Sequence, residues 1–273
     1  MSKLQIHAVP KSARIEKVRD ELNRNINPNL PQIPFVVGLV ASKGSGKSTI
    51  IYNLLHNPSF YYQRFHQVWV FSPTIHLDDT YRMAKFNQER LISDVTLFED
   101  TFKKITESID KSILAITQTV KLNKQLSEEQ IREEVEIQKY KKLDQILVII
   151  DDSVGVKGLA HGIIPNMFSR HRHYFISFLY AVQIYKAMPP IMRVNLNAII
   201  LFRILNRAEL KKVVEEQATR VNDKEWLRLY NEATKDSKYD FFYINIKNPD
   251  QPFYKNFDTP LPFVEYKEVQ VLP

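Results

Sequence analysis

The sequence contains no cysteine, which excludes disulfide bonds, thiol nucleophiles and cysteine-ligated zinc sites. It also has no apolar run approaching the ~18 residues of a membrane-spanning helix, and its first residues lack the apolar stretch of a signal peptide. We therefore expect an intracellular protein without a membrane span. With 273 residues, 44% of them hydrophobic, the chain is long enough to bury one substantial core.

Glycine is scarce, well under the average usage of ~7%. Only six glycines occur, at positions 38, 44, 46, 155, 158 and 162. Half of them belong to one short motif and half follow a second motif, so backbone freedom is concentrated at two places. The net charge of +7 weakly favours a polyanionic partner such as nucleic acid.

The first motif lies in residues 35–55, FVVGLVASKGSGKSTIIYNLL. Residues 35–40 are apolar and predict a buried strand, and the residues after the glycines have helical spacing. A strand, a glycine-containing loop and a helix form the context of a phosphate-binding loop, in which Lys47 contacts the β- and γ-phosphates and Ser48 ligates magnesium. A chance glycine turn is the alternative, and the lysine and hydroxyl argue against it. The candidate nucleotide-binding residues are Ser42, Lys43, Gly44, Ser45, Gly46, Lys47, Ser48 and Thr49.

The second motif is a continuous apolar run at residues 146–150, followed by Asp151 and Asp152. Such a run is typical of a parallel strand covered on both faces. We predict that Asp151 binds the same magnesium ion as Ser48, and that Asp152 polarises the attacking water. A solvated acidic turn is the alternative, which the upstream phosphate loop makes less favourable. The glycines at 155, 158 and 162 predict a mobile loop near the γ-phosphate.

Further strands are predicted at residues 68–71, 174–182 and 198–204. At least one strand thus separates the two motifs in the sequence. This order favours ATPases with a strand inserted between the two motif strands in space over nucleotide kinases. Gln183 follows the strand at 174–182, at the carboxyl edge where ligands of open α/β sheets bind. We predict that Gln183 senses the γ-phosphate, with a plain surface glutamine as the alternative.

Residues 166–203, NMFSRHRHYFISFLYAVQIYKAMPPIMRVNLNAIILFR, show a further pattern together with ASKGSGKST and ILVIIDDS. The combination resembles the genome-packaging ATPases of large DNA viruses, the poxvirus-type branch of the FtsK–HerA superfamily. The matching features are Arg172 and His173, Gln183, Pro189 and Pro190, Arg193 and Asn195, and the strand from residue 198 to 202. Residues 239–258 also look like the closing strands of that family, so the resemblance covers residues 33–260. Departures are Ala41 in place of glycine, Val182 before Gln183, and Asp152 where many cellular relatives have glutamate.

The resemblance implies an α/β fold of the P-loop NTPase (RecA/FtsK-like) type, with a mostly parallel sheet flanked by helices, a helical insertion and C-terminal strands. It implies ATP and Mg²⁺ as cofactors, double-stranded DNA as partner, and a homo-oligomeric ring of five or six subunits. Capsid or portal proteins are further expected partners, and the host cytoplasm (virus factory) and the virion are the expected locations. An arginine from the neighbouring subunit would stabilise the transferring phosphate; the candidates are Arg172, then Arg193, then Arg170. A basic rim that contacts solvent or DNA is the alternative for each.

The expected organisation is an N-terminal helical arm at 1–30, an ATPase core at 31–222 with a helical insertion at about 78–144, and a C-terminal strand-containing segment at 223–273. Ser127 and Gln130 predict a capping box that opens a helix inside the insertion. Candidates for DNA phosphate contacts are Lys157, Lys186, Arg207, Lys211 and Lys212. The histidines at 161, 171 and 173 lack the carboxylate or cysteine partners that a zinc site needs.

The leading functional hypothesis is an ATP-driven translocase of double-stranded DNA that packages a viral genome into a capsid. The alternatives are another nucleic-acid-dependent ATPase or helicase of the same class, and an assembly protein gated by nucleotide with slow hydrolysis. A small-molecule kinase is disfavoured by Gln183 and by the spacing of Arg193 and Asn195.

Overall fold

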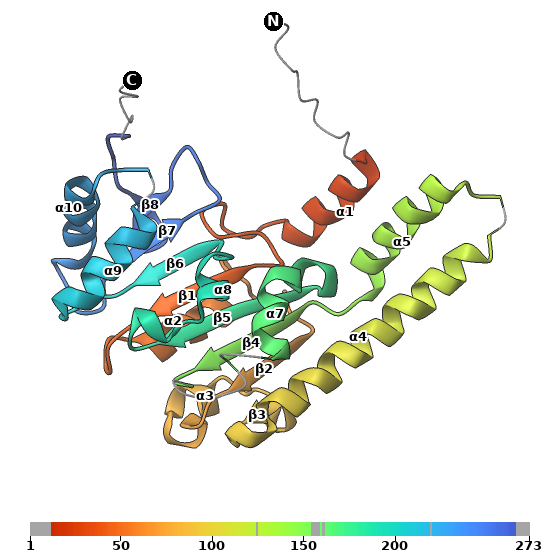
Figure 1. Ribbon diagram of the computed structural model, residues 1–273, viewed down its shortest axis with the longest axis horizontal. Coiled ribbons are helices and arrows are strands. Elements are labelled where there is room, and N and C mark those ends of the chain that lie inside the picture. The colour runs from red at the N-terminus through yellow and green to blue at the C-terminus, as the bar shows by residue number, and fades with distance from the viewer. Residues whose placement is uncertain (1–11, 124, 154–158, 160–161, 219, 266–273) are drawn as a thin grey trace, which may run out of the picture.

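The computed structural model describes residues 12–123, 125–153, 159, 162–218 and 220–265. Within them, one sheet has the strand order β3-β2-β4-β5-β1-β6-β7-β8-β9 (Figure 1). Strands β3 to β6 in this order are parallel, and β7, β8 and β9 continue the sheet as antiparallel strands. The strands are β1 Val36–Val40, β2 Gln67–Phe71, β3 Leu91–Ile92, β4 Ile146–Asp151, β5 Ile176–Val182, β6 Ala198–Leu201, β7 Phe242–Asn245, β8 Phe253–Lys255 and β9 Thr259–Pro260.

Helices cover both faces of the sheet, so the mostly parallel α/β fold expected from the sequence is confirmed. The helices are α1 Ala13–Asn23, α2 Lys47–His56, α3 Asp79–Met83, α4 Phe98–Lys121, α5 Glu128–Lys142, α7 Ile163–Arg170, α8 Pro190–Arg193, α9 Arg207–Gln217 and α10 Asp223–Thr234. Short 3₁₀ helices are η1 Ile75–Leu77, η2 Gln88–Arg90, η3 Val95–Leu97, η4 His171–Tyr174 and η5 Tyr185–Ala187. One core lies under α4, α7, α9 and α10, and the other lies under α2. None of the helices in the described residues is long and apolar enough to cross a membrane.

Strand β5 lies between the phosphate-loop strand β1 and the acidic strand β4. Tyr180 of β5 pairs with Gly38 on one side and with Ile150 on the other. The predicted inserted strand is therefore present. It is not the strand that separates the motifs in the sequence, because β2 pairs with the outer side of β4.

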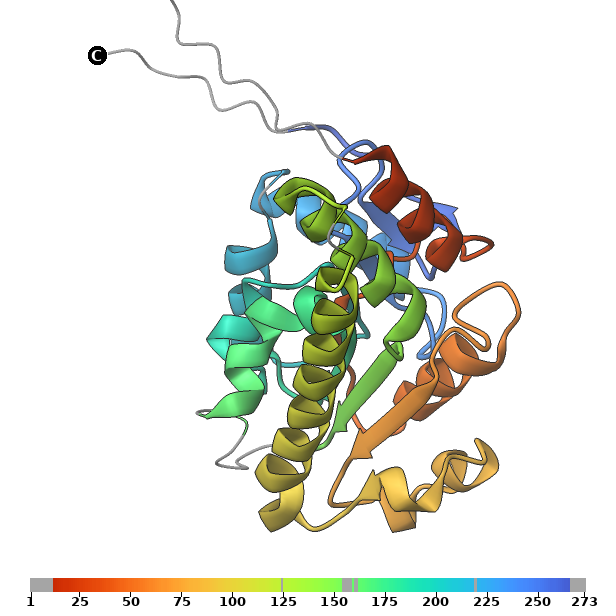
Figure 2. The same ribbon diagram turned by 90° about the vertical axis from the view of Figure 1, so that its right-hand side faces the viewer.

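Residues 78–144 form two different structures. Helices α4 and α5 make an antiparallel hairpin along one face of the sheet (Figures 1 and 2), and Ser127 and Gln130 cap α5 as predicted. The apolar residues of α4 recur at helical spacing, so this helix is amphipathic and buries one side. Residues 78–97, by contrast, belong to the sheet edge, because β3 pairs with β2. Only the hairpin is thus a helical insertion.

The two ends of the described chain pack on this core. Helix α1 lies against α5, where Arg14 forms ion pairs with Glu133 at 3.0 Å and Glu134 at 2.8 Å. Helix α10 stacks Trp226 on Tyr230 and packs both rings on β7. The boundaries of the expected arm, core and C-terminal segment stay predictions.

Candidate nucleotide-binding site

The predicted phosphate loop joins β1 to α2 at the carboxyl edge of the sheet. Gly44 and Gly46 have φ angles of +79° and +97°, a region that L side chains rarely adopt. Helix α2 begins at Lys47 and has no side-chain cap from the described residues, whereas Ser12 caps α1 and Ser127 caps α5. Its first N–H groups and the positive end of its dipole therefore suit a phosphate.

Two carboxylates at the end of β4 meet the phosphate-loop lysine. Lys47 Nζ lies 2.7 Å from Asp151 Oδ1 and 2.5 Å from Asp152 Oδ1. The Asp151 side chain is 3% exposed and that of Asp152 is 24% exposed. Burial raises the pKa of Asp151 above the usual range, and the Lys47 ammonium opposes this shift. The loop cation and the strand carboxylates thus form one ion-paired cluster beside the phosphate loop.

The segment after β2 adds two residues that the sequence reasoning missed. Ser48 Oγ donates a hydrogen bond to Asp78 Oδ2, and the Tyr81 hydroxyl donates to Asp151 Oδ2 at 2.8 Å. Burial raises the pKa of Tyr81 well above its usual value, and the Asp151 carboxylate adds to this. An acidic residue shortly after a parallel strand was the available signal, because all such strands end at one edge. The sequence instead predicts a helical insertion that begins at about residue 78.

Gln183 lies at the same edge, directly after β5. Its Nε2 donates to Asp152 Oδ1 at 3.3 Å, and its side chain is exposed. Asp152 has a φ of +48°, and its N–H donates to the carbonyl of Ala181 at 3.3 Å. The fold therefore holds Asp152 in a left-handed turn between Lys47 and Gln183. The structure brings together Lys47, Ser48, Asp151, Asp152 and Gln183, as the sequence predicted.

The two leading candidate arginines do not lie at this site. Arg172 is exposed in η4, which precedes β5 and so lies at the opposite edge of the sheet. Arg193 forms an ion pair with Glu216 at 2.9 Å, donates to the carbonyl of Met188 at 2.8 Å and covers the ring of Tyr185. Either arginine could serve only the site of a neighbouring subunit. Arg172 could do so as it stands, whereas Arg193 would first have to leave its partners.

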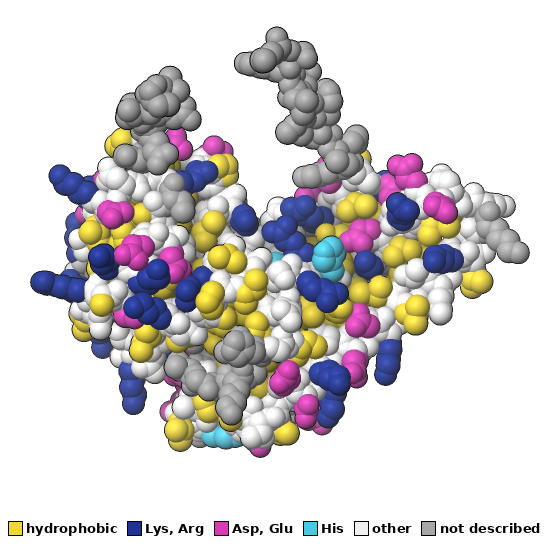
Figure 3. All heavy atoms as spheres, viewed as in Figure 1, with side chains coloured by type: hydrophobic (Ala, Val, Ile, Leu, Met, Phe, Trp, Pro, Cys, Tyr) yellow, Lys and Arg dark blue, Asp and Glu magenta, His cyan; other side chains and the backbone are white. Residues whose placement is uncertain are grey.

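Arg172 lines a hollow of about 510 Å³ at this opposite edge. Among the described residues around it, the charged side chains are Arg19, Arg172 and Lys247. Figure 3 shows Lys and Arg side chains gathered where the face is hollowed between α1 and the C-terminal strands. The described lining of the hollow therefore carries positive charge and no acidic side chain.

Several other predicted residues lie elsewhere or outside the described part of the chain. Gly155, Gly158, His161 and Lys157 are outside it, and so is most of the expected glycine loop. His171 is buried in η4 and its Nδ1 lies 2.8 Å from the Phe168 carbonyl, whereas His173 is exposed.

Within the described residues, no three side chains of the His, Asp and Glu types converge as a metal centre. Magnesium remains compatible with the site, because it needs only one or two carboxylates beside water and substrate phosphates.

Fold and site together define a P-loop NTPase with a strand inserted between the phosphate-loop strand and the acidic strand. A family model described as Poxvirus A32 protein matches residues 22–246, so the chain belongs to the Poxvirus A32 family. The family predicted from the sequence is thereby confirmed. A search of curated protein sequences finds no match.

Solved structures of a viral protein share the fold. The genome packaging NTPase B204 from Sulfolobus turreted icosahedral virus 2 matches in complex with sulfate, with a TM-score of 0.51, 15% identity, and 86% of this chain and 100% of that chain covered. Its complex with ATP-gammaS matches with a TM-score of 0.50, 14% identity, and 85% and 98% covered. B204 from Sulfolobus turreted icosahedral virus, the DNA-packaging ATPase, matches with a TM-score of 0.50, 16% identity, and 81% and 94% covered. At these identities the likeness concerns the fold.

Proposed function

We propose that this protein is an ATPase that uses ATP hydrolysis to move double-stranded DNA into a viral capsid. The observation that carries the proposal is the meeting of Lys47, Ser48, Asp151, Asp152 and Gln183 at one sheet edge, in a chain of the Poxvirus A32 family. The structural relatives are described as genome packaging NTPases, one of them in complex with ATP-gammaS. This supports ATP as the nucleotide and packaging as the process.

The donor set fits magnesium. Ser48 Oγ and the Asp151 carboxylate are hard oxygen ligands, and Asp78 holds the Ser48 hydroxyl from the other side. Ser48 and Asp151 would hold the ion, directly or through water, and Asp78 would orient Ser48. A bound magnesium ion neutralises charge on the β- and γ-phosphates. Tyr81 fixes the orientation of Asp151 through its hydroxyl.

Lys47 and Asp152 would then act on the γ-phosphate and the water. Lys47 now neutralises two carboxylates, and a bound triphosphate would compete for its ammonium group. Release of Asp152 from Lys47 would leave that carboxylate to accept a proton from the attacking water. Gln183 donates to the same Asp152 oxygen, so it would hold this general base in place. Because Gln183 directly follows β5, a change at the γ-phosphate would also move the end of this strand.

A neighbouring subunit would complete the site in a ring of five or six copies. Ile184 and Leu205 are 48% and 84% exposed beside the phosphate loop, where they line one pocket together with Ser42 and Gln183. Exposed apolar side chains around a charged site suit coverage by another chain. Arg172 of that chain would approach the γ-phosphate, since it is exposed at the opposite edge of the sheet.

DNA would contact basic side chains near the carboxyl edge without base readout. Lys186 lies in η5 and Arg207 opens α9, both after strands that end at this edge, whereas Lys211 and Lys212 form ion pairs with Glu215. Lys186 and Arg207 are therefore the better candidates. Capsid or portal proteins would be further partners, in the virus factory and in the virion.

The test is ATP turnover of the purified protein with and without long double-stranded DNA. We expect duplex DNA to stimulate turnover strongly, and Lys47→Ala to abolish it with and without DNA. Lys103→Ala is the control, because this lysine is 64% exposed on α4. Equal turnover with and without DNA would contradict the translocase and support a nucleotide-gated assembly protein. Separation of the duplex strands would instead indicate a helicase.

A further inference from the structure

An exposed aromatic ring stands directly beside the phosphate loop. A Cβ atom placed on Gly46 would lie 3.3 Å from Tyr239 Cδ1 and 4.0 Å from Cε1. Tyr239 nevertheless leaves 57% of its surface exposed. The ring therefore touches the start of α2 and still offers a large flat surface to solvent.

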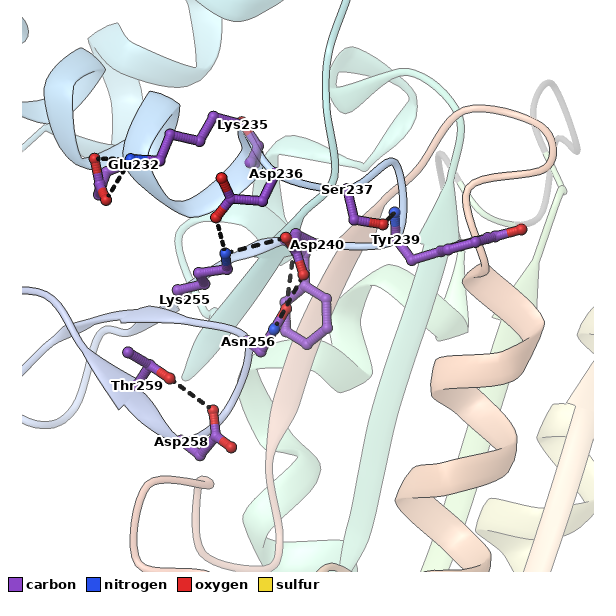
Figure 4. Close-up of polar contacts among 12 residues, drawn as sticks. Glu232, Lys235, Asp236, Ser237, Tyr239, Asp240, Lys255, Asn256, Asp258 and Thr259 are labelled. Atoms are coloured by element: carbon purple, nitrogen blue, oxygen red, sulfur yellow. Dashed lines mark hydrogen bonds and ion pairs between the residues drawn. The ribbon is translucent and has the colours of Figure 1, made fainter.

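The backbone that carries Tyr239 is fixed by a compact set of polar contacts. Lys255 Nζ binds Asp236 Oδ2 at 2.5 Å and Asp240 Oδ2 at 3.1 Å, and Asn256 donates to Asp240 Oδ1 at 3.3 Å. The N–H of Tyr239 donates to Ser237 Oγ at 3.1 Å. Figure 4 shows the ring of Tyr239 pointing away from these contacts, toward the phosphate loop and α2. These contacts thus fix the backbone of Tyr239, and the ring is in position without a bound ligand.

The sheet order places Tyr239 on the side of the loop away from the carboxylates. Asp151 ends β4, two strands from β1 on one side, and β7 lies two strands from β1 on the other. Phe242, the first residue of β7, pairs with Leu201, the last residue of β6. Tyr239 therefore lies at the same carboxyl edge as the phosphate loop. A triphosphate with its γ end at Lys47 and Asp151 would extend past α2 with its nucleoside toward Tyr239.

We propose that the ring of Tyr239 is the stacking surface for the base of the bound nucleotide. This inference rests on the nucleotide binding proposed above and adds the residue that binds the base. Lys238 Nζ lies 4.7 Å from the centroid of the Tyr239 ring, so the cation covers one face and the base uses the other. Stacking on an aromatic ring tolerates every base because each has a π face. The ligand class is thus a purine or pyrimidine nucleoside triphosphate, selected mainly by its phosphates.

The experiment measures binding of magnesium-ATP and of inorganic tripolyphosphate by calorimetry. Tyr239→Ala should weaken ATP binding by about ten- to a hundredfold and leave tripolyphosphate binding within about twofold. Tyr239→Phe should bind both ligands like the unchanged protein, because the ring and not the hydroxyl stacks. Tyr62→Ala is the matched control, since this tyrosine is 42% exposed and follows the far end of α2.

Two outcomes would overturn the inference. One is unchanged ATP affinity in Tyr239→Ala; the other is an equal loss of ATP and tripolyphosphate, which would indicate a disturbed phosphate loop. Lys47→Ala separates this from failure of the proposed site. If that variant bound both ligands normally, the phosphate-loop assignment itself would fail, whatever Tyr239 does.

Discussion

The two edges of the parallel sheet differ in how their positive side chains are paired. At the carboxyl edge, Lys47 is balanced by Asp151 and Asp152. At the opposite edge, the hollow around Arg172 is lined by cations with no acidic side chain among its described lining residues. The first arrangement is ordered before any ligand binds, whereas the second has only cations among the charged side chains of its described lining. The difference agrees with the proposal that the first edge does the chemistry and that the second meets an anion of a neighbouring subunit.

The largest expected effect comes from removing Arg172. In the oligomer, Arg172→Ala should lower the DNA-stimulated turnover by about 10³-fold or more, because a trans arginine stabilises charge on the transferring phosphate. ATP affinity measured by calorimetry should stay unchanged. Lys247→Ala removes a cation of the same hollow and should lower turnover less than about threefold. Equal losses in the two variants would show that only the overall charge of the hollow matters.

The next effect concerns the carboxyl edge. Asp152→Asn should lower kcat by about 10²- to 10⁴-fold while ATP still binds, because a general base contributes a factor of that size. Steady-state kinetics separates the two quantities. The matched control is Asp144→Asn, an exposed aspartate before β4. A raised KM with unchanged kcat would mean that Asp152 binds substrate and is not the base.

A third effect belongs to the edge that carries Arg172. Burial lowers the pKa of His171 from 6.5 to about 4. The unfolded chain therefore binds a proton below pH 6.5 that the folded protein does not bind until about pH 4, and stability falls as the pH falls through this window. The loss is on the order of 3 kcal/mol, since one pKa unit is about 1.4 kcal/mol.

Urea unfolding at several pH values measures this dependence. His171→Gln should flatten the dependence of the free energy of unfolding on pH between pH 6.5 and about 4. His173→Gln changes an exposed ring nearby and should leave this dependence unchanged. An unchanged profile in His171→Gln would show that other groups cause the acid sensitivity.

The smallest expected effect tests the order of the carboxyl edge. Tyr81→Phe removes the hydroxyl that donates to Asp151 and should lower the free energy of unfolding by about 1 kcal/mol. Tyr62→Phe is the control, because Tyr62 is exposed and its hydroxyl accepts a hydrogen bond from the adjacent Gln63. Equal stability of Tyr81→Phe and the unchanged protein would mean that Asp151 does not depend on this contact.

The carboxyl edge was largely predictable from the sequence, for a physical reason. Apolar runs that end in Asp151 or Gln183 predict parallel strands, and parallel strands bring their carboxyl ends together. Asp78 is hidden by the helical insertion that the sequence predicts from about residue 78, and Tyr239 lies on an irregular segment without periodicity. Tyr239 reaches the phosphate loop only through the antiparallel strand β7, whose position in the sheet depends on tertiary packing.

The most direct test of the account mixes two inactive variants. Arg172→Ala subunits keep an intact carboxyl edge, and Asp152→Asn subunits keep an intact Arg172. If one edge serves the other across a subunit boundary, a random equal mixture should regain DNA-stimulated ATP turnover, because about one interface in four then combines both intact edges. A mixture as inactive as either variant alone would contradict the claim that Arg172 completes the site of the next subunit.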